Sequence, residues 1–524
     1  MRELVARYLS QSLSRRGFVN RLVKTGLSLT AAQSVAASLN PSLRAEAAAG
    51  EDLKIFQGTA GEAMAEQLIA SGVKYIFGNP GSKDSFFYDA LVDRPELTYI
   101  LTPHEGPGAA IATGYVQASL EPALVMQAAA VGLVNAMGQM FNAWKEQTPL
   151  VFYSYRNESS RSAGRDGFEE VLYQEELVDP VTKWHWRARR PDMIPETLRR
   201  AFKVAWTPPY GPTYSTWHSD YLGTEVRTEI ISHKMVDPRM RVRPNPQEVE
   251  RAARLLVEAE LPLMFVGDEL YKAGGIARAV QLADLLGMPV SQPWQVFANF
   301  PQTHPFWVPG LPDPPAAVRS FAQNPDLIIN VGNKLQLSTF AVPSGTSFID
   351  MRIDSSSMGN VIPTEVPLVA DVAHGLEDLI EAVEDIMTPS LQKKVQERSQ
   401  RVREATETYK RLRNTMMKNP DWDASPLLSD RLTYEIAQFA DRDAIIIDEA
   451  GGTGGKHFFD FNPLGGRELF SFHAGHLGSG VGRAAGVKLA RPNQQVIGLV
   501  GDGAFIFGPT ALWTMARLGL GVIV

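Results

Sequence analysis

An aspartate between two glycines lies near the end of the sequence, where its carboxylate could bind a metal ion. Asp502 in the tripeptide GDG follows the apolar run 496–500 and precedes a helical pattern at 510–518. Glycines allow a tight turn and a close approach of the backbone to an anion, and a carboxylate is the hard ligand that magnesium takes beside phosphate oxygens. Although a bare GDG is common at turns, this setting predicts a site for magnesium and a phosphate group.

A second carboxylate, that of Glu105, lies far upstream in the segment TPHEGPGAAIATGYVQAS. The small residues that follow it predict a closely packed helix. An acid at a helix start commonly stabilises the helix dipole, and taken alone this structural role is the better interpretation. The occurrence of both segments in one chain favours a functional role instead.

Together the two segments resemble the thiamine diphosphate (ThDP) enzymes of the acetolactate synthase and benzoylformate decarboxylase type. The resemblance implies that Glu105 acts on the cofactor's pyrimidine, favouring the tautomer that takes the proton of the reactive thiazolium carbon. It also implies that Asp502 binds Mg²⁺, with an Asn further along the chain as the second ligand. Because the sequence ends before that Asn, at Val524, we expect a chain truncated in its last domain.

Other segments extend the resemblance to the rest of the cofactor site. FGNPGS at 77–82 ends a strand pattern, where ligands approach open α/β sheets, and resembles the benzoylformate decarboxylase loop, in which Ser82 would face the substrate carboxylate; an ordinary turn is the alternative. FHAGHLGSGVGRAAG resembles the stretch that holds the pyrimidine, with Leu477 as the wedge that bends ThDP. The residues implied to bind the cofactor are Gly78, Asn79, Gly81, Gly451, Gly452, Gly475, Leu477, Gly501, Gly503 and Ala504.

The histidines depart from the benzoylformate decarboxylase pattern. Where those relatives carry a His, the segment MQAAAVGLVNAM has Gln127 and Ala128, which removes a candidate proton shuttle. His476 stands where relatives usually have Gly, and we expect it to be catalytic together with Glu105 and Ser82; a structural hydrogen-bonding role is the alternative. These differences leave decarboxylation and carboligation of a 2-oxo acid both open.

Alternating strand and helix patterns must position these residues. Apolar strands alternate with helices along the chain, which predicts βαβ units and parallel sheets. At 524 residues the chain is too long for one hydrophobic core. We therefore expect an α/β protein with three doubly wound parallel-sheet domains. The expected parts are a pyrimidine-binding domain at 51–215, a linker at 216–243, a central domain at 244–388, a helical linker at 389–425 and a diphosphate-binding domain at 426–524.

Composition restricts the remaining classes of function. The net charge of -7 argues against nucleic-acid binding, and the absence of Cys excludes disulfides and thiolate chemistry. No phosphate loop at 260–360 compels a flavin, so FAD is not expected. The run GSGVG at 478–482 resembles a dinucleotide loop only weakly, because no strand pattern leads directly into it.

The N-terminus resembles a twin-arginine export signal. SRRGFV at 14–19 contains the Arg15-Arg16 pair, an apolar stretch follows at 26–39, and AEAAAG at 45–50 suits cleavage. The apolar stretch is too short to span a membrane as a permanent helix. We expect residues 1–49 to be a signal and the protein to be periplasmic; an amphipathic or disordered tail with a chance Arg pair is the alternative.

Three readings of function follow from these segments. The first is an enzyme that acts on a small-molecule 2-oxo acid. It would form a homodimer or a dimer of dimers, and ThDP and Mg²⁺ would lie between the first domain of one subunit and the third domain of another. The second is a non-catalytic exported ThDP-binding protein. The third is an inactive truncated product. No nucleic acid is an expected partner.

Overall fold

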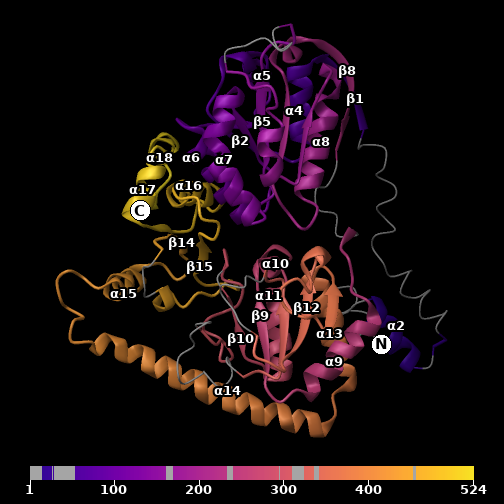
Figure 1. Cartoon of the computed structure of the whole chain (residues 1–524), viewed down its shortest axis with the longest axis vertical. Helices are drawn as coiled ribbons and strands as arrows, with labels where there is room; N and C mark the ends of the chain where they lie inside the picture. The colour runs from indigo at the N-terminus through magenta and orange to yellow at the C-terminus, as the bar shows by residue number, and fades with distance from the viewer. Residues whose placement is uncertain are drawn as a thin grey trace. The chain divides into compact units, whose positions relative to one another are not determined.

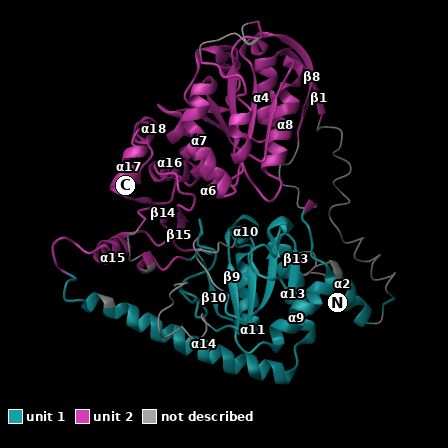
Figure 2. Cartoon of the chain, viewed as in Figure 1, with its two compact units in different colours: residues 1–50, 241–422, 462–464 teal, residues 51–240, 423–461, 465–524 magenta. Residues whose placement is uncertain are grey.

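The computed structural model describes residues 15–25, 27–28, 53–160, 169–232, 240–293, 295–309, 324–334, 342–451 and 456–524. The chain divides into two compact units (Figure 2). Unit 1 comprises 1–50, 241–422 and 462–464, and unit 2 comprises 51–240, 423–461 and 465–524. Three sheets are parallel throughout, and helices alternate with their strands (Figure 1), which confirms the predicted α/β fold. In the described part of the chain, no helix combines the length and the apolar character needed to cross a membrane.

The six-stranded sheet of unit 2 has the strand order β3-β2-β4-β5-β7-β6. Every residue of β4 (Leu124–Gln127) and β5 (Val151–Arg156) is buried, as expected for a parallel sheet covered on both faces. The other strands are β2 (Tyr75–Gly78), β3 (Thr98–Leu101), β6 (Trp184–Arg187) and β7 (Thr213–His218). The helices of this part are α4 (Ala60–Ala70), the short η2 (Ser82–Asp84), α5 (Ser85–Val92), α6 (Glu105–Ser119), α7 (Ala129–Lys145) and α8 (Ile194–Ala205).

A four-stranded sheet forms the C-terminal part of unit 2, with the order β15-β14-β16-β17. β14 and β16 are neighbours although β15 lies between them in the sequence, so the direction of strand addition reverses there. The strands are β14 (Ile445–Glu449), β15 (Glu468–Ser471), β16 (Val496–Val500) and β17 (Val522–Ile523). The helices are α15 (Ser429–Phe439), α16 (Gly480–Ala490), α17 (Asp502–Phe507) and α18 (Ala511–Leu518).

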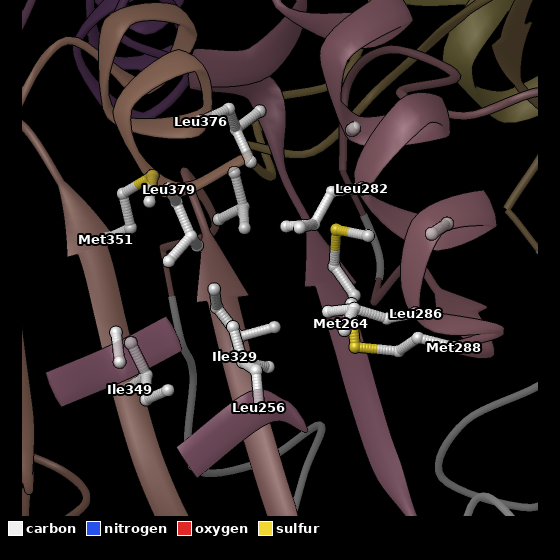
Figure 3. Close-up of a cluster of buried hydrophobic side chains, with 14 of the residues drawn as sticks. Leu256, Met264, Leu282, Leu286, Met288, Ile329, Ile349, Met351, Leu376 and Leu379 are labelled. Carbon is white, nitrogen blue, oxygen red and sulfur yellow. The ribbon is translucent and has the colours of Figure 1, made fainter. Parts of the chain in front are cut away.

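Unit 1 is built on a parallel sheet with the order β10-β9-β11-β12-β13. Apolar side chains from strands and helices, among them Leu256, Leu282 and Ile329, form its core (Figure 3). The strands are β9 (Pro262–Val266), β10 (Val290–Ser291), β11 (Leu327–Val331), β12 (Ser347–Arg352) and β13 (Val366–Val369). The helices are α2 (Arg15–Lys24), α9 (Pro246–Glu258), α10 (Asp268–Lys272), α11 (Ile276–Leu286), α13 (Val372–Ile386) and the long α14 (Pro389–Thr415).

One expected segment differs in the structure, and another lies mostly outside the described residues. Part of the expected linker 216–243 is β8 (Glu225–Ile231), which pairs antiparallel with β1 (Leu53–Thr59) at the start of unit 2. This strand belongs to unit 2 because its backbone groups are satisfied by a partner far away in the sequence. The expected signal 1–49 lies mostly outside the described residues, which include only 15–25 and 27–28 of it.

Candidate functional site

The first part of the candidate site lies where β2 and β4 end. These strands are neighbours at the point where the order of the six-stranded sheet reverses, and ligands of open α/β sheets bind at the carboxyl ends of strands next to such a point. Gly78 is the last residue of β2 and Gln127 the last of β4. The segments that follow the two strands are therefore in position to form a site.

Glu105, the first residue of α6, is 5% exposed. His104 precedes it as the N-cap, and its Nδ1 accepts a hydrogen bond from the Gly106 amide at 3.1 Å. The Glu105 carboxylate itself accepts two amide hydrogen bonds, from Asn79 Nδ2 to Oε1 at 3.2 Å and from Asn135 Nδ2 to Oε2 at 3.0 Å. A carboxylate has about four acceptor positions, so one held in this way has a fixed direction and can still accept from a ligand.

Helix α7 presents positions 135, 138 and 142 on one face, because residues three and four apart are neighbours on a helix. Asn135 holds Glu105. A Cβ on Gly138 would lie 2.2 Å from Nε2 of His476, so the imidazole occupies the space that glycine leaves. Asn142 exchanges two hydrogen bonds with the His476 backbone, donating to its carbonyl oxygen at 2.8 Å and accepting from its amide at 3.1 Å. Helix α7 thus joins the N-terminal carboxylate to the C-terminal loop.

The protonation of His476 follows from this packing. Partial loss of hydration lowers the pKa of His476, and the nearby negative charge of Glu449 opposes that effect. The imidazole is therefore neutral near pH 7, although part of it stays accessible to solvent. A neutral ring in this position can accept a proton from a bound molecule.

Two glycines at the end of β2 and in the loop after it, Gly78 and Gly81, pack closely against other residues. A Cβ on Gly78 would lie 2.3 Å from the carbonyl oxygen of Met126, and a Cβ on Gly81 would lie 2.4 Å from the ring of Tyr155. Both positions therefore require glycine for packing. Ser82, which begins η2, is exposed and so accessible to a ligand.

Asp84, two residues further on, was not singled out by the sequence. Its side chain is buried and accepts a hydrogen bond from the Tyr153 hydroxyl at 2.9 Å. Burial raises the pKa of Asp84 to about 7, although the bond from Tyr153 acts in the opposite direction. The carboxyl group of Asp84 therefore titrates near pH 7 within the segment that follows β2.

The second part of the candidate site lies at the reversal between β14 and β16. The amide of Gly501 donates to the carbonyl oxygen of Glu449 at 3.2 Å, which holds the ends of the two strands together. Asp502 is exposed, and its Oδ1 accepts from the Gly503 amide at 2.8 Å. A Cβ on Gly503 would meet nothing within 4 Å, whereas Ala504 is buried. The GDG turn is therefore open on the side where a ligand would lie.

The loop between β15 and α16 is held at its far end by a buried acid. The Glu449 carboxylate accepts from the amides of Ser479 and Gly480 at 3.1 and 2.6 Å. Further back, Gly475 has a φ of 110°, which favours glycine, with open space beside it. Leu477 is 39% exposed, an apolar side chain presented by a fixed loop.

The N-terminal and C-terminal parts of unit 2 pack through α6 and α16. A Cβ on Gly114 would lie 2.1 Å from the carbonyl oxygen of Arg483, so the two helices make backbone contact there. Glu146 and Arg483 form a buried ion pair across the same interface at 2.9 Å. The resemblance implies a site between two subunits; in this chain the two parts that would form it pack within one compact unit.

Gly451 and Gly452 are the last two expected cofactor-binding residues. Gly451 is exposed with a φ of 57°, and Gly452 lies outside the described residues.

Gln127 and Ala129 are two further residues of the site that were not expected to bind the cofactor. Gln127 is 1% exposed, and within the described ranges neither its Oε1 nor its Nε2 has a hydrogen-bond partner. Ala129 follows at a φ of 51°, a strained value for a residue with a Cβ. Strain and an unsatisfied amide at a strand end are features of functional sites.

The residues present fit ThDP and magnesium. They supply a buried, oriented carboxylate, an open glycine turn and an exposed carboxylate at Asp502. Among the described residues, no group of three or more His, Cys, Asp or Glu side chains could hold a metal ion. Magnesium bound with a diphosphate needs only one or two protein carboxylates, so a single Asp at the turn suits that cation.

The sequence singled out neither Asn135 nor Asn142. Asn135 lies in the segment already compared for its missing His, and Asn142 follows two turns later in the same helical pattern, with Gly138 between them. Each makes a contact to another part of the chain that local spacing does not specify.

Models of three domains of one family match the chain. The N-terminal TPP (thiamine pyrophosphate) binding domain of thiamine pyrophosphate enzymes matches residues 58–177, the central domain 249–379 and the C-terminal TPP binding domain 450–524. Their order in the sequence is that of the three predicted domains, and together they cover more than half of the chain.

Individual relatives agree with the models. The chain is 27% identical to a probable acetolactate synthase large subunit of Methanocaldococcus jannaschii, over 88% of this chain and 79% of that protein. It is 29% identical to benzoylformate decarboxylase of Pseudomonas aeruginosa, over 86% of this chain and 82% of that protein. A solved ThDP-dependent 4-hydroxybenzoylformate decarboxylase of Rhodococcus jostii matches with a TM-score of 0.72 and 26% identity, covering 89% of this chain and 85% of that one.

Proposed function

Because the chain belongs to the thiamine pyrophosphate enzyme family, we propose that it is a ThDP- and Mg²⁺-dependent enzyme that acts on a 2-oxo acid by decarboxylation, carboligation or both. The observation that supports this most is the carboxylate of Glu105. It is buried at a helix start, oriented by Asn79 and Asn135, and placed at a strand-order reversal.

When bound, ThDP would supply a nucleophilic carbon and a sink for the electrons left by departing carbon dioxide. Glu105 would hold a proton shared with the cofactor's pyrimidine, and its two amide donors fix the orientation of the carboxylate. Leu477 would offer the cofactor an apolar surface. Asp502 and the open GDG turn would hold the magnesium ion and the diphosphate.

The substrate end of the site combines two accessible groups. Ser82 is exposed beside Gly81 and offers a hydroxyl to a carboxylate, and the neutral imidazole of His476 can accept or return a proton. The named relatives include both acetolactate synthases and benzoylformate decarboxylases. Both aliphatic and aromatic 2-oxo acids therefore belong in the test panel.

A non-catalytic ThDP-binding protein is the second candidate, and one observation favours it. The position of the decarboxylase histidine holds Gln127 and Ala128, so an acid–base group used by relatives is missing. Tight binding of ThDP with no consumption of any 2-oxo acid would support this candidate over the enzyme.

Calorimetry and an activity panel test the proposal together. The protein is titrated with ThDP in the presence and absence of Mg²⁺, and then assayed for carbon dioxide release and for carboligation products. Saturable binding that needs magnesium, with turnover of at least one 2-oxo acid, is the expected result. Asp502→Asn should weaken magnesium-dependent binding, while Asp443→Asn, a substitution of an exposed acid in the same part of unit 2, should not. Absence of binding would contradict the proposal.

We also propose that the protein is a homodimer or a dimer of dimers. Large apolar side chains on two consecutive helices, α17 and α18, are exposed, among them Ile506 at 75%, Phe507 at 62% and Trp513 at 45%, and exposed apolar patches commonly mark interfaces. Light scattering during gel filtration measures the mass. A monomer at micromolar concentration would contradict this part of the proposal.

Export by the twin-arginine route is a further part of the proposal, supported by SRRGFV at 14–19 and the apolar stretch after it. Cell fractionation tests it. Replacing both Arg15 and Arg16 by Lys should keep the protein in the cytoplasm, and unchanged export in that variant would contradict it.

A further inference from the structure

Helix α2, which begins at the Arg15-Arg16 pair, is seated on the folded central domain. Phe18 and Leu22 are 0% and 1% exposed, and Val19 is 7% exposed. The helix lies beside α9 and α13 of the same unit (Figure 1). A ten-residue helix is marginal in water by itself. Contact with the domain therefore stabilises this segment as a helix.

Charge complementarity accompanies the apolar contact. Arg21 pairs with Glu384 at 3.3 Å, and Lys24 pairs with Asp385 at 3.4 Å, so both cations meet acids at the end of α13. The carboxylate of Glu381 occupies the space beside Gly17, since a Cβ there would lie 2.2 Å from its Oε2. The end of α13 is an acidic surface facing a basic helix.

The contact is also incomplete. The acids and cations of both ion pairs remain partly exposed, and pairs of this kind stabilise a fold only weakly. A cavity of 380 Å³ is lined by α2, α9 and α13, including Gly17, Asn20, Val249 and Ala253. Helix α2 is therefore held by a few buried side chains and two partly exposed ion pairs beside this cavity.

We propose that α9 and α13 of the folded central domain form a docking surface for α2, and that docking withholds the twin-arginine pair from the export machinery. In this proposal the receptor binds the pair only on the undocked helix, so its apparent affinity is reduced in proportion to the fraction of the protein in which α2 is undocked. The inference rests on the proposed export, but docking itself is measurable without it.

The acid reversal and its control are placed in the central domain so that the signal sequence stays intact, whereas the charge swap also changes one residue of 1–49. Glu384→Arg with Asp385→Arg reverses both partners of the basic helix. Glu258→Arg with Glu260→Arg is the matched control, because these acids of the same domain are exposed and, among the described residues, Glu260 pairs with Lys394 and not with α2. Arg21→Glu with Glu384→Arg swaps one pair and should restore it.

Hydrogen exchange of the full-length protein measures docking. Amides of residues 18–24 should exchange at least about fivefold faster in the Glu384→Arg, Asp385→Arg protein than in the wild type or the control. Leu22→Ala should raise the rate more, by about thirtyfold, whereas Val23→Ala on the exposed face should not. Equal and fast exchange in every protein would overturn the docking.

The exported fraction measures the consequence. It should rise in the Glu384→Arg, Asp385→Arg protein, stay at the wild-type level in the control, and fall back towards that level in the Arg21→Glu, Glu384→Arg swap. Export that is equal in all of these proteins, and that still depends on Arg15 and Arg16, would overturn masking. Lack of export in every protein would instead contradict the proposed localisation, while hydrogen exchange would still decide the docking.

Discussion

The side-chain amide of Asn135 donates a hydrogen bond to Oε2 of Glu105 over 3.0 Å, from the second turn of a different helix. Asn79 donates to the other oxygen at 3.2 Å. Because each oxygen of this buried carboxylate already accepts a hydrogen bond, the carboxylate can bind a further group only through its remaining acceptor positions. The proposed chemistry of Glu105 therefore depends on two neutral residues that take no part in proton transfer.

Asn135→Ala removes one of these donors and is expected to lower turnover at least about tenfold, because a hydrogen bond to a charged group contributes about 1.5–3 kcal/mol. Asn360→Ala, which removes an exposed Asn side chain of unit 1, is the control. Turnover in the Asn135 variant equal to that of the wild type would rule out the positioning role.

Gln127→Met tests whether the unsatisfied amide at the end of β4 serves the reaction. Removing a buried group without partners should raise the free energy of unfolding by about 1 kcal/mol, while the KM for the 2-oxo acid rises. Gln139→Met is the matched control, because Gln139 is equally buried but accepts from Asn142 at 3.0 Å and should destabilise the protein when replaced. Urea unfolding and steady-state kinetics measure both effects. A stabilised variant with unchanged KM would show that Gln127 has no part in substrate binding.

His476→Gln is expected to remove the acid limb of the pH profile of kcat. Gln keeps a polar side chain of similar reach but cannot titrate, and loss of one general acid–base group commonly costs about a hundredfold in rate. Because burial lowers the pKa of His476, that limb should lie below pH 6.5 in the wild type. His185→Gln, remote in the sequence and paired with Asp179, is the control. A retained acid limb would assign the titration to another group.

Asp84 predicts a dependence of stability on pH. Its pKa is raised by burial from 3.8 to about 7, so the folded state binds its proton more tightly than the unfolded state. This contribution to stability is fully present below pH 3.8 and is lost as the pH rises to about 7. Asp84→Asn keeps an acceptor for Tyr153 and cannot ionise. Relative to the wild type, it should gain at least about 1.4 kcal/mol between pH 5 and pH 8 in urea unfolding, the free energy of one pKa unit; a constant difference would contradict the shifted pKa.

Local patterns predicted the elements of this fold well, and contacts between elements poorly. The apolar run at 496–500 and the helical pattern at 510–518 correspond to β16 (Val496–Val500) and α18 (Ala511–Leu518). Helix α17 was missed because the glycines of GDG resemble a turn, and β8 was missed because its partner strand lies at the other end of the N-terminal part. Parallel pairing and strand order are set by connections that the local sequence does not specify.

The same distinction holds in the site. Glu105 and Asp502 lie in segments whose residue types indicate a function, and the family resemblance implies a role for each. Asn135, Asn142 and Asp84 carry no motif of their own. Their importance comes from a hydrogen bond to another helix, a contact with a loop more than three hundred residues away, and burial beneath a turn.

The most direct test of the proposed function is Glu105→Gln, measured by ThDP calorimetry and 2-oxo acid turnover on the same preparations. Gln is isosteric and keeps acceptor capacity for one of the two Asn donors, but it cannot hold the proton at the pyrimidine nitrogen. The variant should therefore stay folded and bind ThDP with magnesium, while turnover falls at least about a hundredfold. Turnover equal to that of the wild type, with ThDP still required, would contradict the assigned role of Glu105 and with it the proposed mechanism.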